Sequence, residues 1–224
     1  MGNTSVVCGI SAELSEPTVE SPDKGYIVPN VVLSPLSNPK HKSGPPSDYA
    51  QSLSAKILQL LLSMSPELET GLCIERGKCV WTLYMDIQFL NYDGNALDAA
   101  WLSLSTALSR MELPPIQYNT DINRGVIIDG VPTKVPFEGE NVFVCSFVGI
   151  DQGPYVLADP NEEEESLAME TVIVAIDLER QLRYLYKSGN ALTREDIKKC
   201  IELAAERAGY LSFIAEENSY KAFH

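Results

Sequence analysis

The chain has 224 residues, of which 45% are hydrophobic and 21% charged, a composition typical of a folded globular protein rather than a disordered or fibrous one. Lys and Arg number 17 against 31 Asp and Glu, so the formal net charge is −14, which repels phosphate backbones and argues against an enzyme that binds RNA on its own. No apolar run reaches the roughly 18 residues that span a bilayer, and the first residues lack the basic start and apolar block of a signal peptide.

Cysteine and histidine usage argues against a metal site. The five cysteines are scattered, none forms a CxxC pair, and the only histidines are His41 and His224. Zinc sites and Cys–His nucleophile pairs need these residues at defined spacings. We therefore expect reduced thiols in the core, no metal, no cofactor, and a location in the cytosol or the nucleus.

In the first part of the chain, the residue pattern predicts a strand, an extended segment and a helix. Residues 4–10 are rich in β-branched side chains and predict a buried strand. Prolines punctuate the following stretch, so the short apolar run at 26–28 is expected in an extended, looping segment. Ser47 is placed to cap a helix that Pro66 stops. The apolar face of this helix comprises Leu53, Ile57, Leu60, Leu61 and Met64.

A long strand and a second helix are predicted next. Alternate positions from 79 to 89 are apolar, which indicates a strand with one strongly buried face. Residues 91–95 form a turn, and apolar positions then recur at helical spacing until the prolines at 114–115. These helical positions are Leu97, Trp101, Leu104, Leu108 and Met111. Trp81 and Trp101 fall in the apolar registers, so we expect both in the core and not as platforms for RNA bases.

The second half of the chain is predicted to contain several strands followed by a helix. The predicted strands cover residues 125–131, 141–150, 155–158, 171–176 and 182–186. The final helix is expected to begin near Thr193, which has Asp196 three residues on as a weak capping box, and to extend beyond Ala208. Strands mixed with helices predict an α+β fold in which helices pack on one face of a mixed sheet.

Five short sequence segments carry a family resemblance through their residues and their order along the chain. They are residues 2–9 (GNTSVVCG), 25–30 (GYIVPN), 43–47 (SGPPS), 90–99 (LNYDGNALDA) and 158–165 (ADPNEEEE). Together they resemble the RNase PH-like ring subunits of the eukaryotic RNA exosome, and the resemblance covers nearly the whole chain. It implies the RNase PH-like fold, which is similar to the second domain of ribosomal protein S5.

The resemblance also sets an expectation for domain organisation. It implies a single RNase PH-like domain over residues 1–224, with two lobes at about 1–118 and 119–224. The family has further strands and an Arg-containing segment before the first of the five motifs. We therefore expect the domain to be N-terminally incomplete, with its opening strands missing.

A phosphate-binding turn is the first functional feature that the resemblance implies. Active family members look like phosphorolytic exoribonucleases, which hold inorganic phosphate at a Gly-Gly-Thr-Arg turn that opens the helix after the long strand. A helix N-terminus and a guanidinium suit a dianion. The matching positions here are Gly94, Asn95, Ala96 and Leu97, followed by Asp98.

This turn is interpreted as degenerate. Leu97 cannot clamp phosphate. The Asp98 carboxylate is expected to occupy the helix N-terminus, where it stabilises the helix by roughly 0.3–1 kcal/mol and repels an anion. Asp98 is equally compatible with an ordinary acidic residue at a helix start.

An acidic pair is the second feature. The resemblance implies that active members carry two acidic residues six apart at a strand end, to activate the nucleophile or hold magnesium. Asp159 and Glu165 stand at these positions, with three more glutamates between them. Without an anion clamp the pair has no phosphate to activate, so we interpret it as vestigial and the segment as a solvated acidic turn rather than a metal site.

Lys40, His41 and Lys42 form a small basic cluster before the first predicted helix. The resemblance places such loops near neighbouring subunits or RNA, so these three residues are candidate contacts to either. A solubilising surface turn is the alternative interpretation.

The function implied by the resemblance is that of a non-catalytic structural subunit in the hetero-hexameric ring of the RNA exosome. Its partners would be other RNase PH-like subunits, S1/KH cap subunits and single-stranded RNA in the ring channel, with no membrane. Associated nucleases would carry out 3′-to-5′ processing and degradation, including rRNA maturation and mRNA turnover, in the nucleus, nucleolus and cytoplasm.

Two alternatives stay open. The chain could be an active phosphate-dependent exoribonuclease or nucleotidyltransferase that uses Asp159 and Glu165. It could also fail to assemble, because missing opening strands leave an unpaired sheet edge.

Overall fold

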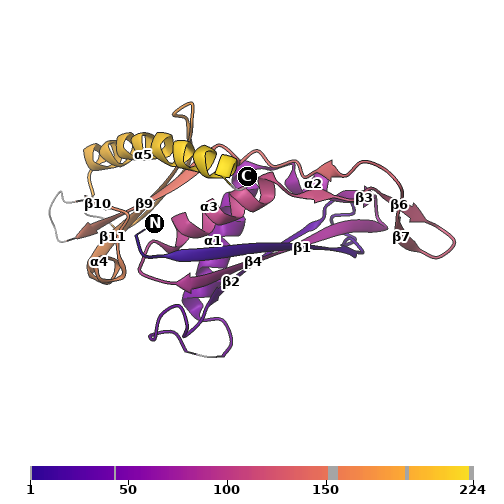
Figure 1. Cartoon of the computed structure of the whole chain (residues 1–224), viewed down its shortest axis with the longest axis horizontal. Helices are drawn as coiled ribbons and strands as arrows, with labels where there is room; N and C mark the ends of the chain where they lie inside the picture. The colour runs from indigo at the N-terminus through magenta and orange to yellow at the C-terminus, as the bar shows by residue number, and fades with distance from the viewer. Residues whose placement is uncertain (1, 43, 151–155, 190–191, 222–224) are drawn as a thin grey trace.

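The computed structural model describes residues 2–42, 44–150, 156–189 and 192–221. Within these ranges, two four-stranded sheets and the helices that cover them form the body of the protein (Figure 1). Ser43 and Tyr155, which the sequence places in a motif and a strand, lie outside the described residues. Across the described part of the chain, every helix is too short or too polar to cross a membrane.

The first sheet is mixed and comes from the first half of the chain. Its strands are β1 (Ser5–Ser15), β2 (Tyr26–Leu33), β3 (Cys73–Glu75) and β4 (Cys79–Asn91). β4 lies in the centre, antiparallel to β1 and β3 and parallel to β2. The alternation predicted for β4 is confirmed, because Leu83, Met85, Ile87 and Phe89 are fully buried whereas the residues between them are exposed.

β2 is longer than the sequence predicted. The looping segment expected at 26–28 is an eight-residue strand that includes Pro29. β2 lies at the edge of the sheet and pairs with β4 alone among the described residues. A proline is tolerated on an edge strand, because its missing N–H can face away from the ladder.

Two helices pack on one face of this sheet. α1 (Asp48–Met64) begins after Ser47, whose side chain accepts a hydrogen bond from the N–H of Ala50 (3.2 Å), so the predicted cap is confirmed. The predicted apolar face of α1 is buried. α3 (Ala96–Ser109) packs against β1 and β4. It ends earlier than predicted, since Met111 lies beyond its last residue.

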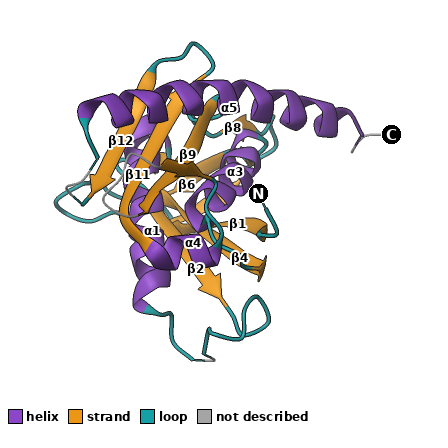
Figure 2. Ribbon diagram, turned by 90° about the vertical axis from the view of Figure 1, so that its left-hand side faces the viewer, coloured by secondary structure: helices purple, strands orange, loops and turns teal. Residues whose placement is uncertain are grey.

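The second sheet is antiparallel throughout, in the order β10-β9-β11-β12. Its strands are β9 (Val142–Ile150), β10 (Val156–Ala158), β11 (Ala168–Asp177) and β12 (Leu182–Ser188). α5 (Arg194–Lys221) lies along one face, as Figure 2 shows. The other face joins the core of α1 and α3, where the indole N–H of Trp101 donates to the carbonyl of Val142 (2.8 Å). Because both faces are covered, β9 is buried at all but its last position.

Shorter elements complete the fold. A hairpin of β6 (Ile116–Asn119) and β7 (Arg124–Ile127) stands at one end of the molecule (Figure 1), and β5 (Glu112–Leu113) pairs with β8 (Thr133–Lys134). α2 (Leu68–Gly71) and α4 (Glu162–Leu167) are short helices. β7 covers only the start of the strand predicted over 125–131.

Several sequence predictions are settled by this architecture. The α+β fold with helices on a mixed sheet is confirmed, and a second, antiparallel sheet adds to it. Trp81 and Trp101 are both buried, as predicted. Thr193 and Asp196 form the predicted capping box, with the Thr193 N–H donating to the Asp196 carboxylate (3.0 Å). The division into two lobes near residue 118 stays a prediction.

Candidate functional site

The predicted phosphate turn and the predicted acidic pair meet where α3 begins. Gly94 and Asn95 have φ angles of 82° and 49°, so the turn passes through the left-handed region. A Cβ atom at Gly94 would lie 2.4 Å from the carbonyl carbon of Asn161 and 2.5 Å from the carbonyl oxygen of Pro160. The turn therefore lies backbone against backbone on the segment that carries Asp159 and Glu165.

Glu165 occupies the turn. Its Oε1 accepts a hydrogen bond from the backbone N–H of Asn95 (2.8 Å), and its Oε2 accepts one from the hydroxyl of Tyr92 (3.0 Å). Burial raises the pKa of Glu165, and these two hydrogen bonds oppose the rise. A backbone N–H that an anion would need is thus bound to a side chain of the protein itself.

The acidic segment is a helix and not the solvated turn that the sequence predicted. Asn161 caps α4 by accepting a hydrogen bond from the N–H of Glu164 (2.9 Å), and the Glu164 carboxylate accepts one from the N–H of Asn161 (2.9 Å). This capping box fixes the helix start. It also sets Glu165 in the first turn of α4, where its carboxylate reaches the start of α3.

Asp98 does not close the helix N-terminus in the way the sequence predicted. Its carboxylate turns toward β9 and accepts hydrogen bonds from the N–H (3.0 Å) and the hydroxyl (2.7 Å) of Ser146. A third bond comes from the side-chain amide of Asn95 (2.9 Å). Burial raises the pKa of Asp98 to about 6, against the lowering effect of these bonds and of Arg207. The negative charge at the turn comes from Glu165 instead.

Arg207 is a site residue that the sequence analysis missed. Its Nη2 atom lies 3.1 Å from Oδ1 of Asp159 and 3.9 Å from Oδ2 of Asp98. The Asn95 amide also donates to Asp159. The only signal was the position of a cation between Ala204 and Ala208, on the buried face of the last helix.

A cavity of about 220 Å³ opens beside the turn. Lys56 of α1 lines it, with its ammonium 5.3 Å from the ring centroid of Tyr186, and its charge acts to lower the pKa of Glu165. Oδ1 of Asn95 is buried at this cavity with no hydrogen-bond partner among the described residues. The region thus holds three carboxylates, those of Asp98, Asp159 and Glu165, and two cations, Lys56 and Arg207. Because the carboxylates outnumber the cations, the local charge does not attract a further anion.

Potential metal-binding side chains do not gather into a site in the part of the chain that the structure describes. Over the described ranges, no cluster of three or more His, Cys, Asp or Glu residues could hold a metal ion. Asp159 and Glu165 bind protein donors instead: Arg207 and Asn95 for the first, Asn95 and Tyr92 for the second.

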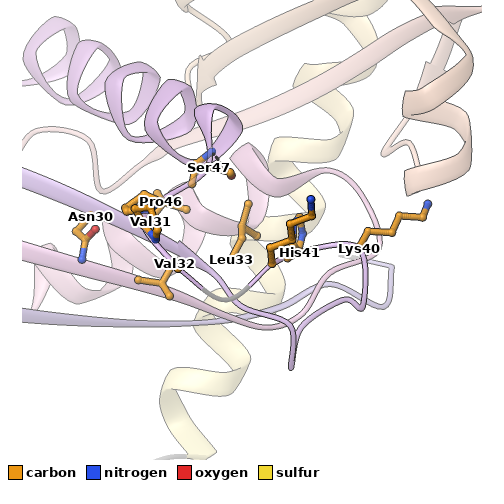
Figure 3. Close-up of a pocket in the computed structure, with 12 residues that line it drawn as sticks. Asn30, Val31, Val32, Leu33, Lys40, His41, Pro46 and Ser47 are labelled. Atoms are coloured by element: carbon orange, nitrogen blue, oxygen red, sulfur yellow. Dashed lines mark hydrogen bonds between the residues drawn. The ribbon is translucent and has the colours of Figure 1, made fainter.

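The predicted basic cluster lies on the loop before α1, beside a cavity of about 590 Å³ whose other wall is β2 (Figure 3). The Lys40 ammonium lies 2.9 Å from the Glu162 carboxylate, and the His41 ring packs edge-on against Tyr92 at 5.3 Å between centroids. Lys42 is exposed and forms no ion pair with any described residue. Contact of these residues with RNA or a neighbouring subunit stays a prediction.

Comparison with known proteins defines the class. Residues 1–114 match the 3′ exoribonuclease family, domain 1, and residues 141–207 match domain 2 of the same family, the RNase PH family. The chain therefore belongs to the RNase PH family of 3′ exoribonucleases.

Its relatives include named exosome components. The chain is 38% identical to exosome complex component rrp43 of Schizosaccharomyces pombe over 207 residues, which covers 92% of this chain and 76% of that protein. It is 32% identical to exosome complex component Rrp42 of Methanocella arvoryzae, over 94% of this chain and 77% of that protein. The resemblance to RNase PH-like exosome subunits that the motifs indicated is confirmed.

The fold agrees with a solved relative. A chain from the Archaeoglobus fulgidus exosome with RNA bound to the active site matches with a TM-score of 0.76 and 27% sequence identity. The match covers 95% of this chain and 79% of that one. The RNase PH-like fold is thereby confirmed.

Proposed function

We propose that this chain is a structural subunit of the RNase PH-like ring of an RNA exosome and does not itself cleave RNA. Support comes from relatives named as exosome components and from the similarity to an exosome structure that holds RNA. In this role the chain contacts other RNase PH-like subunits in a hetero-hexameric ring, supports S1/KH cap subunits and lines part of the RNA channel. Associated nucleases carry out the 3′-to-5′ degradation, in the nucleus, the nucleolus and the cytoplasm.

The absence of catalysis is inferred from the hydrogen bond between the Asn95 N–H and Glu165 Oε1 (2.8 Å). Phosphorolysis needs inorganic phosphate held in line with the terminal phosphodiester of RNA. At this turn a carboxylate is already bound, and Leu97 stands where a clamping side chain is needed. An incoming phosphate would have to displace the partly buried Glu165 carboxylate from its donors, which leaves that charge unpaired.

The second candidate is an active phosphate-dependent exoribonuclease or nucleotidyltransferase. Arg207 favours it, since this guanidinium lies 3.1 Å from Asp159 and could in principle bind phosphate. The structural role is preferred because the Arg207 side chain is only 17% exposed and lies between two carboxylates. Its charge is balanced within the protein.

Release of nucleoside diphosphates distinguishes the two candidates. The full chain, alone and in a ring reconstituted with its other subunits, is incubated with RNA and inorganic phosphate. We expect no release from the chain alone, and no difference between rings that carry wild-type chain or Asp159→Ala. Asp121→Ala, at an exposed position, is the control. The proposal would be overturned if nucleoside diphosphates were released by the wild type and by Asp121→Ala but not by Asp159→Ala.

Ring membership is tested separately by co-purification. The full chain is expected to elute with other RNase PH-like subunits as one complex of defined mass. A well-folded chain that binds none of them would contradict the structural role.

A further inference from the structure

We infer that this chain contacts single-stranded RNA at a cavity lined by Lys78, Tyr118 and Arg124, at the base of the β6–β7 hairpin. The inference rests on the proposed function and names residues through which the ring subunit meets RNA. The cavity has a volume of about 370 Å³, and its walls come from the end of β1, the start of β4 and the hairpin. Ligand pockets span roughly 300–1,000 Å³, so this one has room for a small group such as one nucleotide.

The cavity is built into the fold by Gly125. A Cβ atom at this position would lie 2.9 Å from side-chain atoms of both Ile116 and Leu14, and 3.2 Å from Sγ of Cys79. Because glycine has no Cβ, the hairpin backbone packs directly on the ends of β1 and β4. Tyr118 is paired with Gly125 across the hairpin, which fixes the Tyr118 backbone against the same strands. The pocket is therefore formed before any ligand arrives.

The lining combines an aromatic ring with two cations. The Lys78 ammonium lies 5.1 Å from the ring centroid of Tyr118, a cation–π contact that keeps charge and ring together. Arg124 lines the same cavity and forms no ion pair within the part of the chain that the structure describes. Single-stranded nucleic acid is recognised by this combination, in which bases stack on rings and phosphates bind cations.

Opposing charge at the cavity is small. The Lys78 ammonium has one carboxylate partner, Glu75, at 3.7 Å, and both side chains are about half exposed. Glu16 is the acidic residue among those that line the cavity, so the lining itself holds two cations and one carboxylate, on a chain whose net charge is −14. At the predicted basic cluster, by contrast, Lys40 already pairs with Glu162 at 2.9 Å.

An acidic protein segment is the competing occupant. It would use the two cations but has no need of the Tyr118 ring, whereas a nucleotide uses both. This difference favours RNA.

Binding of a fluorescein-labelled oligouridine to the assembled ring tests the inference, with this chain as wild type or variant. Each phosphate contact of a single strand contributes about 0.7 to the slope of log affinity against log salt, so K78Q/R124Q should lower that slope by about 1.4. Tyr118→Leu should weaken binding about tenfold through lost stacking. R194Q/K198Q, which removes one Arg and one Lys from exposed positions of α5, is the matched control and should change neither value.

Photocrosslinking of 4-thiouridine RNA to the wild-type ring gives a readout that needs no variant. The expected crosslinked tryptic peptide is residues 111–124, which contains Tyr118. An unchanged salt slope in K78Q/R124Q, or crosslinks confined to other peptides, would overturn the inference. Loss of ring assembly in K78Q/R124Q, together with wild-type crosslinks confined to other peptides, would assign the cavity to an acidic protein neighbour. Failure of the wild-type chain to enter a ring contradicts the proposed function before RNA is added, so the two failures are distinguishable.

Discussion

The guanidinium of Arg207 lies 3.1 Å from the carboxylate of Asp159, measured from Nη2 to Oδ1. The same nitrogen lies 3.9 Å from Asp98, so one cation of the last helix stands between an acid of α3 and an acid beyond β10. Asn95 bonds both of these acids and, through its backbone, Glu165. The side chains at the expected phosphate turn and acidic pair thus bind one another and join α3, α4 and α5.

Replacing Arg207 by Gln is expected to destabilise the protein by about 1–3 kcal/mol, because it leaves the buried Asp98 carboxylate without a counter-charge. Lys199→Gln is the matched control on the same helix. Its side chain is 66% exposed and lies 3.9 Å from Asp196, and exposed pairs of this kind contribute roughly 0–1 kcal/mol. Urea unfolding at pH 7 measures both. Equal losses of stability in the two variants would mean that the ion pairs of Arg207 with Asp98 and Asp159 stabilise the protein no more than a surface ion pair does.

The raised pKa of Asp98 should make the stability of the protein depend on pH. Its folded pKa of about 6 lies above the ordinary value of 3.8, so between these values the folded state binds more protons than the unfolded state. The contribution of Asp98 to stability therefore falls as pH rises from 4 to 6, by an amount on the order of 3 kcal/mol. Asp98→Asn cannot ionise, so its stability relative to wild type should rise between pH 4 and pH 7. The free energy of unfolding of both proteins is measured by urea unfolding at several pH values in this range. If the difference between the two proteins did not change with pH, Asp98 would not titrate there.

Two glycine-to-alanine substitutions should have opposite signs. Gly94→Ala places a Cβ at φ 82° and within 2.6 Å of three backbone atoms of residues 160–162, and we expect a loss of more than about 2 kcal/mol. At Gly209 on α5 a Cβ would meet nothing within 4 Å, so Gly209→Ala should stabilise by roughly 0.5–1 kcal/mol. Thermal unfolding measures both variants. A neutral Gly94→Ala would contradict the close packing of the turn on the acidic segment.

The spacing of hydrophobic residues and the capping signals were sufficient to predict α1 and β4 from the sequence. Ser47 caps α1, and the odd positions of β4 from Cys79 to Phe89 are buried, because local pattern and tertiary packing agree there. The prediction failed at Pro29, since a proline argues against a central strand but not against the edge strand that β2 is.

The partners of the acidic residues could not be read from the sequence. Asp98 has the position of a helix-start acid, but the buried N–H and hydroxyl of Ser146 offer it better donors than the helix end. The run of four glutamates indicates a solvated acidic turn, and the capping box by which Asn161 and Glu164 begin α4 is not apparent from the sequence alone. Arg207 lies in a helix of mixed charge with no motif around it, so only the packing of α5 on the second sheet reveals its role.

The central claim is that the turn at the start of α3 holds the protein's own Glu165 carboxylate in place of a phosphate ion. Titration of the isotope-labelled full chain with inorganic phosphate tests it. The backbone amides of Asn95, Ala96 and Leu97 are followed by NMR, with Glu165→Ala as the variant that frees the Asn95 N–H and Glu163→Ala as the exposed control. We expect no saturable shift at these amides in the wild type or in Glu163→Ala, and a shift in Glu165→Ala. A saturable shift at Asn95 in the wild-type protein would contradict the account.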